Sequence, residues 1–156
     1  MKSPKIARIA AVALAAAFAS AAFAADTQNL VVTANVQGTC KLTAVPAMTF
    51  TLDPTVGTDQ TQTSAVQYKC TKNTAPTTFT VGGATAAAGY SNSLSGGALG
   101  SIPFSLAWTA PSSAGNGLGS SAAAITVTLT GTIVGTDYVN MAAGAYTQSV
   151  PVVIAP

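Results

Sequence analysis

The strictest pattern in the sequence is the alternation of apolar and hydroxyl side chains along residues 125–133. Ile125, Val127, Leu129 and Ile133 occupy alternate positions together with Gly131, and threonine fills each position between them. Successive side chains of a β-strand point to opposite faces, so this period of two predicts a strand with one buried and one solvated face. The glycine on the inward side permits a bulge or the close approach of another segment.

Shorter alternations recur along the rest of the chain. They predict strands at residues 30–37, 40–45, 48–52, 64–70, 77–81, 101–108 and 144–154. Residues 53–62 and 110–121 are rich in turn-forming residues and are predicted loops, and residues 82–100 a hairpin-like excursion. Short strands separated by such turns are typical of an antiparallel β-sandwich, so the predicted fold class is all-β.

Residues 1–24 have the three parts of a secretory signal peptide. Two lysines and one arginine precede an apolar stretch at residues 9–18, and Ala-Phe-Ala at 22–24 matches a cleavage site. The apolar stretch is too short to cross a bilayer, and no later stretch reaches about 18 uninterrupted apolar residues. We therefore expect an exported mature chain without a membrane span. It is divided into an N-terminal segment at residues 25–38 and one domain at residues 39–156.

The few charged residues exclude several classes of function. After the leader, three lysines and four aspartates leave a net charge of −1, which disfavours a nucleic-acid partner. The chain has no histidine and no glutamate, and its lysines and aspartates form no nucleophile–base or paired-carboxylate pattern. We expect no enzyme and no cofactor.

Two polar or aromatic features are candidate ligand sites. Asp53 and Asp59 bracket a loop that could hold calcium. Two carboxylates provide few of the oxygen ligands that this ion needs, and the EF-hand spacing is missing, so no metal site is predicted. Trp108 and Tyr90 could form a sugar-stacking platform, yet a tryptophan at an inward strand position is more typical of a core.

Cys40 and Cys70 are the only cysteines. Exported proteins reside where thiols oxidise, so one disulfide between them is expected. It would join the start of one predicted strand to the end of another.

The predicted strand at residues 30–37 decides the function. Leu30, Val32, Ala34 and Val36 share one face, and the strand precedes the segment that the disulfide closes. Only two residues follow the last predicted strand, so an edge of the sandwich would lack a partner and invite an added strand. The N-terminal strand could pair within its own domain, or it could be supplied to a neighbour, and the alternation alone favours neither.

Four segments resemble the spore coat protein U family, which includes major subunits of archaic chaperone-usher pili. Residues 32–40 (VTANVQGTC) are similar to the family's alternating strand before its first cysteine, and residues 66–70 (VQYKC) to the strand with the second. Residues 102–106 (IPFSL) stand where the family has a tyrosine-rich strand, and residues 143–150 (AGAYTQSV) resemble its closing A-G-x-Y segment. Phenylalanine and tryptophan here replace common tyrosines, and Pro151 removes one backbone donor from the last strand.

The resemblance implies an immunoglobulin-like antiparallel β-sandwich that lacks its final strand and is completed by a donor strand from a neighbouring subunit. The implied donor residues are Leu30, Val32, Ala34 and Val36. The implied acceptor groove is lined by Ile125, Val127, Leu129, Ile133, Val150, Val152 and Ile154.

The function that this implies is a structural subunit of an extracellular pilus or fimbrium that supports surface attachment or biofilm formation. Its partners would be identical subunits, arranged head to tail, together with a periplasmic chaperone and an outer-membrane usher. It would pass through the periplasm to the cell surface. The alternative is a secreted monomeric β-sandwich that binds a glycan or a surface as an adhesin or coat protein, with residues 30–37 retained in its own domain.

Overall fold

A computed structural model describes residues 26–156, so the predicted signal peptide at residues 1–24 lies outside the described residues. The chain divides into two units at Ala34, and the described parts of these units are residues 26–34 and residues 35–156. In the first unit, the described residues 26–34 form no helix or strand, and Leu30, Val31 and Val32 are more than 80% exposed. Residues 35–39, at the start of the second unit, are likewise exposed and outside any sheet.

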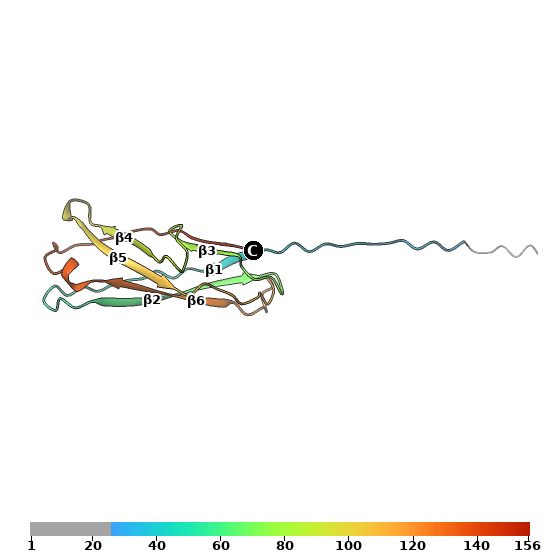
Figure 1. The fold of residues 1–156 in the computed structure, drawn as a ribbon, viewed down its shortest axis with the longest axis horizontal. Coiled ribbons are helices and arrows are strands. Elements are labelled where there is room, and N and C mark those ends of the chain that lie inside the picture. The colour runs from blue at the N-terminus through green and yellow to red at the C-terminus, as the bar shows by residue number, and fades with distance from the viewer. Residues whose placement is uncertain (1–25) are drawn as a thin grey trace, which may run out of the picture. The chain divides into compact units, whose positions relative to one another are not determined.

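The second unit is all-β and antiparallel, with its strands in two sheets (Figure 1). The larger sheet has the order β1-β2-β6-β5-β4. Its strands are β1 (Cys40–Ala44), β2 (Gln60–Cys70), β4 (Tyr90–Ser95), β5 (Ser101–Trp108) and β6 (Ile125–Ile133). The smaller sheet pairs β3 (Thr78–Val81) with β7 (Val152–Ala155), and two 3-10 turns, η1 (Gly97–Leu99) and η2 (Gly135–Asp137), complete the elements.

The inward faces of the strands form one hydrophobic core. The nine-residue ladder between β2 and β6 sets Val66 opposite Val127 and Ser64 opposite Leu129, with each threonine of β6 on the other face. In β5 the inward residues Ile102, Phe104, Leu106 and Trp108 are all buried. Trp108 is therefore a core residue, as expected, and not half of a sugar platform.

Two predicted strands are longer or better defined than the sequence suggested. β2 begins at Gln60 rather than at residue 64, because its Thr- and Gln-rich first half pairs with the end of β6. The hairpin-like excursion at residues 82–100 contains β4, which pairs with β5 through six residues. Such polar strands lack the apolar alternation that predicts a strand, and pairing with a neighbour forms them instead.

Three predicted strands are wrong or shortened. Residues 48–52 and residues 30–37 belong to no sheet, and the closing strand at 144–154 is reduced to β7 with one isolated bridge between Thr147 and Ser95. Residues 48–52 keep the alternating burial of a strand, since Met48, Phe50 and Leu52 are half-buried and the residues between them are exposed. What these segments lack is a hydrogen-bonding neighbour, and side-chain alternation carries no information about that.

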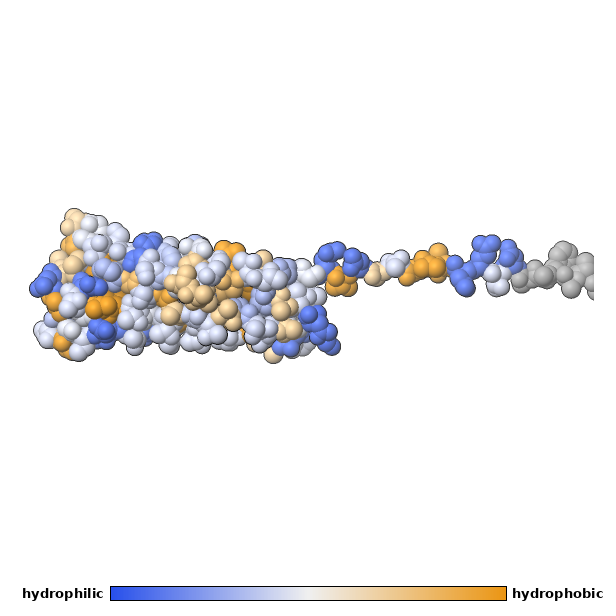
Figure 2. All heavy atoms as spheres, in the orientation of Figure 1, coloured by the Kyte–Doolittle hydropathy of each residue, from blue (hydrophilic) through white to orange (hydrophobic). Residues whose placement is uncertain are grey.

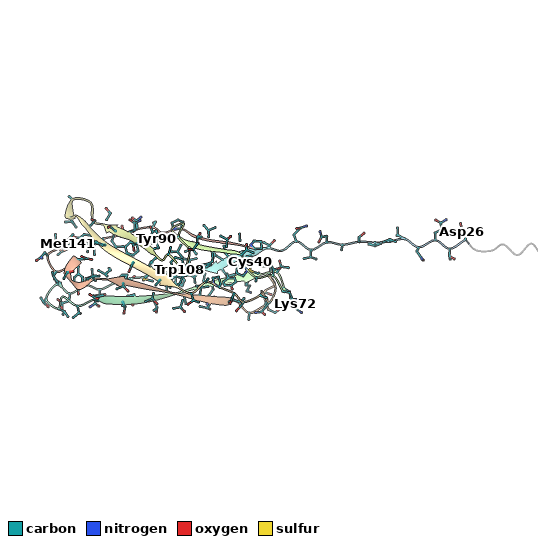
Figure 3. The ribbon with its side chains drawn as sticks, viewed as in Figure 1. Asp26, Cys40, Lys72, Tyr90, Trp108 and Met141 are labelled. Atoms are coloured by element: carbon teal, nitrogen blue, oxygen red, sulfur yellow. A yellow bond between two sulfur atoms is a disulfide. The ribbon has the colours of Figure 1, made fainter. Side chains whose placement is uncertain are left out.

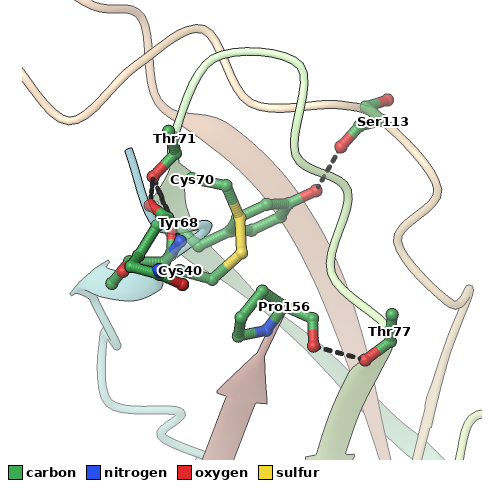
Figure 4. The surroundings of a disulfide bond; sticks show 9 residues. Cys40, Tyr68, Cys70, Thr71, Thr77, Ser113 and Pro156 are labelled. Atoms are coloured by element: carbon green, nitrogen blue, oxygen red, sulfur yellow. Dashed lines mark hydrogen bonds between the residues drawn. A yellow bond between two sulfur atoms is a disulfide. The ribbon is translucent and has the colours of Figure 1, made fainter. Parts of the chain in front are cut away.

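The expected disulfide joins Cys40 to Cys70, which are directly opposite in the β1–β2 ladder. Cys70 and Tyr68 are fully buried, and the Tyr68 hydroxyl donates to the Ser113 carbonyl at 3.4 Å (Figure 4). Burial raises the pKa of Tyr68 above its usual value, because the charged phenolate would be poorly solvated. The Thr77 hydroxyl donates to the Pro156 carbonyl at 2.6 Å at the same end of the domain (Figure 4).

None of the helical turns in residues 26–156 is long and apolar enough to cross a bilayer.

Replacing both cysteines by serine should lower the free energy of unfolding by about 3.6 kcal/mol, since the bond closes a segment with a sequence separation of 30. Urea unfolding of the oxidised protein and of the double variant measures the difference. A change below about 1 kcal/mol would show that the unfolded chain is not restrained in this way.

Candidate functional site

An open groove runs through the second layer of the domain. It has a volume of about 820 Å³ and lies between residues 45–52 on one side and residues 142–152 on the other. Its floor is the inward face of the larger sheet, with Val66, Ile102, Phe104, Leu106 and Leu129. The site is therefore a gap in a sheet layer, with the hydrophobic core at its bottom.

The first wall, residues 45–52, is an extended segment with an unpaired backbone. Among the hydrogen bonds of residues 26–156, the single one that reaches this wall is donated by the Ser64 hydroxyl to the Pro46 carbonyl at 2.8 Å. Met48 and Phe50 anchor the wall by packing over Gly131, where a Cβ atom would collide with both side chains. The inward glycine of β6 thus permits a close approach, as expected, and the wall's backbone keeps its hydrogen-bonding groups free.

The second wall, residues 142–152, is paired on one edge alone. The Thr147 N–H donates to the Ser95 carbonyl at 3.0 Å and its carbonyl accepts from the Ser95 N–H at 2.9 Å, while the Pro151 carbonyl accepts from Gly82 at 2.7 Å. Backbone groups of successive strand residues point to opposite edges. Gln148, Val150 and Val152 therefore present their N–H and C=O groups to the groove.

Pro151 does not interrupt this free edge. Its carbonyl is directed at Gly82, so its missing N–H belongs to the edge that faces β3. The proline removes a donor where the β3 ladder ends, and the groove edge retains the N–H groups of Val150 and Val152 on either side of it. This placement agrees with the restriction of proline to positions where the ladder needs no donor.

Tyr146 and Gly144 hold the second wall in place at the mouth of the groove. The Tyr146 ring packs against Gly96, and its hydroxyl lies 2.8 Å from the Ala142 carbonyl and 3.1 Å from the Leu99 carbonyl. Gly144 leaves the room that the Leu99 side chain fills. The A-G-x-Y segment is thus a clasp that fixes residues 142–147 against the loop around η1.

The predicted acceptor residues are only partly brought together. Leu129, Val150 and Val152 line the groove. Ile125 and Val127 line a smaller pocket beside residues 109–113, Ile133 is buried in the core, and Ile154 pairs with Phe79 in the smaller sheet. As acceptor residues, all seven remain predictions.

Most residues of the groove were not among the predicted acceptor residues. The missed ones are Met48, Phe50, Leu52, Leu94, Ile102, Phe104, Leu106 and Tyr146. The alternation of residues 48–52 was a usable signal, since it predicted a strand whose partner the rest of the sequence does not provide. The inward face of β5 was predicted as core, and nothing in its pattern shows that part of it faces an opening.

The groove and the N-terminal segment have matching chemistry. No charged residue lines the groove, and residues 30–37 (LVVTANVQ) carry no charge either. Leu30, Val32 and Val36 are at least 80% exposed, which is unusual for large apolar side chains. Ala34 is exposed as well.

The residues that the structure describes contain no cluster of three His, Cys, Asp or Glu side chains suited to a metal ion. The groove offers apolar surface and unpaired backbone edges, which are the features that the addition of a further β-strand requires. The model of the Spore Coat Protein U domain family matches residues 26–153, and the chain belongs to this family of surface and fibre proteins. No curated protein and no solved structure matches the chain.

Substituting Gly131 by alanine should displace Met48 and Phe50 and lower the free energy of unfolding by about 1–3 kcal/mol through overpacking. Thr130→Ala, at the exposed neighbouring position, is the control and should change it by no more than about 0.5 kcal/mol. Urea unfolding followed by tryptophan fluorescence measures both. Equal stabilities would mean that residues 45–52 do not pack on β6 in solution.

Proposed function

We propose that this protein is a structural subunit of an extracellular pilus or fibre assembled by donor-strand complementation. One observation carries the proposal: the chain has a groove bounded by two unpaired backbone edges, and it also has an unpaired, alternating, uncharged segment of strand length. In this proposal the domain is an immunoglobulin-like sandwich that lacks one strand, and residues 30–37 of a neighbouring subunit supply it.

The dimensions support this assignment. Eight residues of a β-strand span roughly 27 Å, and the second wall contains 11 residues, of which 147–152 follow the bend at residues 143–144. An inserted strand could pair with Gln148, Val150 and Val152 on one side and with residues 45–52 on the other, which would join the two walls into one sheet. Its alternate side chains would reach the floor at Leu129 and Leu106.

The burial of apolar side chains favours a stable contact between the donor strand and the groove of the neighbouring subunit. Leu30, Val32, Ala34 and Val36 together would contribute on the order of 5–8 kcal/mol on leaving water, before the cost of ordering the segment. Hydrogen bonds on both edges of the inserted strand would add to this, since the backbone edges of both walls that face the groove lack partners.

A strand given to one neighbour while another is received generates a head-to-tail contact. Such a contact does not close on itself unless the rotation between subunits forms a ring, and it otherwise propagates into a fibre. The exposed apolar groove would need a cover before assembly, because unpaired strand edges aggregate. A periplasmic chaperone and an outer-membrane usher are the proposed partners in export, and surface attachment or biofilm formation is the proposed role of the fibre.

The test is polymerisation of the mature chain with charged donor positions. Val32→Asp together with Val36→Asp should abolish heat-resistant polymers, because two carboxylates would have to enter the apolar groove. The matched control is Thr33→Asp with Asn35→Asp, which alters the opposite face of the same segment and should leave polymerisation within about threefold.

Size-exclusion chromatography and negative-stain microscopy detect the polymers. Fibres of normal length and yield from the Val32 and Val36 variant would refute the proposal. Monomers from the unsubstituted chain would favour insertion of residues 30–37 into the chain's own domain, which is the arrangement of the monomeric binding module.

A further inference from the structure

The charged side chains of the domain are separated into two groups. Residues 35–156 contain six charged residues, namely Lys41, Lys69, Lys72, Asp53, Asp59 and Asp137. The three lysines, named here the basic pole, lie around the β1–β2 end that the disulfide closes. The three aspartates, named here the acidic pole, lie at the other end of β2.

The structure gives the locations of five of these residues directly, and Asp53 begins the loop that leads to Asp59. Lys41 is opposite Lys69 in the β1–β2 ladder, and Lys72 follows Cys70. Asp59 immediately precedes β2, and its carboxylate accepts a hydrogen bond from the Gly135 N–H at 2.9 Å, beside Asp137 in η2. Lys72 and Met141, which follows η2 closely, are labelled at opposite ends of the domain in Figure 3.

The two poles are too far apart to stabilise each other. The ten residues from Asp59 to Lys69 span roughly 33 Å along β2, several times the screening length of about 8 Å at physiological ionic strength. On the face shown in Figure 2, the most hydrophilic residues of the domain lie mainly toward its two ends. Lys41 and Lys69 are also like charges in directly opposite positions, which costs stability within one subunit.

Gly38 and Thr39, which follow residues 30–37 in the chain, lie at the basic pole. Gly38 lies against Thr74 and Pro156, and the Thr39 N–H donates to the Thr71 hydroxyl at 3.1 Å. At most about 10 Å of chain separates Val36 from Thr39. A donor strand seated in a groove therefore holds its own basic pole close to one end of that groove.

The direction of the inserted strand decides which end this is. Residues 142–155 run from the acidic pole, where the Met141 N–H donates to the Tyr138 carbonyl at 3.0 Å, to Pro156 at the basic pole. A donor antiparallel to this wall brings its basic pole to the acceptor's acidic pole. A parallel donor brings lysines to lysines.

We infer that pole-to-pole attraction between copies of this chain selects the antiparallel insertion of the donor strand and accelerates assembly. The inference rests on the proposed function and adds a second contact, outside the groove, between Lys41, Lys69 and Lys72 of one subunit and Asp53, Asp59 and Asp137 of the next. The contact requires Asp53 in its charged form. The hydroxyl and the backbone N–H of Thr55 donate to its carboxylate and hold the pKa of this group below the usual value.

Ionic strength tests the inference without any substitution. Raising NaCl from about 0.02 M to about 0.5 M should slow polymerisation of the mature chain by about tenfold, since steering between exposed charges is screened. An end-capped peptide of residues 30–37 has no charge and no pole. Its insertion into the full chain carrying Val32→Asp and Val36→Asp should change by less than about twofold over the same range.

Charge exchange locates the effect. Lys41→Glu with Lys72→Glu should slow polymerisation at low salt by about tenfold, and Asp53→Lys with Asp137→Lys should do the same. The chain with all four substitutions should polymerise faster than either double variant but slower than the original chain, because its poles attract again with net charges of −1 and +1 in place of +3 and −3.

Thr63→Glu with Thr128→Glu adds negative charge to the exposed middle of the larger sheet and serves as the control, with an expected change of less than about twofold. If the polymerisation rate changed neither with NaCl concentration nor with charge exchange, and the peptide still inserted normally, the inference would be overturned and the proposed function would stand. Failure of the peptide to insert would overturn both.

Discussion

A strand edge without a neighbour leaves every second backbone N–H and C=O group along it without a partner. In this domain two such edges, residues 45–52 and residues 142–152, face each other across one groove. The other features of the second layer follow from this gap. Met48 and Phe50 hold the first edge by packing over Gly131, and the Tyr146 clasp holds the second. The walls are thus kept extended by side chains instead of by a ladder.

The larger sheet supports the open second layer. Its five strands, the β2–β6 ladder and the disulfide form a layer that needs no further strand. Val66, Leu106 and Leu129 belong to the hydrophobic core and also line the groove, so an inserted strand would complete the burial of this face of β2, β5 and β6. The open layer is therefore available for a partner, and the charges at the two ends add a direction to that partnership.

Much of the fold could be predicted from the sequence, for a clear physical reason. Strands that bury one face against a core, such as residues 125–133 and 101–108, show the period of two in full, and both were predicted with the bounds that the structure has. β4 and the first half of β2 were missed or shortened because polar strands show no such period. The donor segment was recognised from its alternation and the family resemblance, and its role remains a proposal.

The sequence alone determined the all-β class, the buried face of each apolar strand and the disulfide pair, since these depend on local alternation and on two cysteines. The tertiary structure alone decided which strands have neighbours. It showed that residues 48–52 are extended but unpaired, that Pro151 turns its missing N–H away from the groove, and that lysines and aspartates collect at opposite ends. Hydrogen-bonding partners and charge separation arise from residues far apart in the chain, and a local pattern does not contain them.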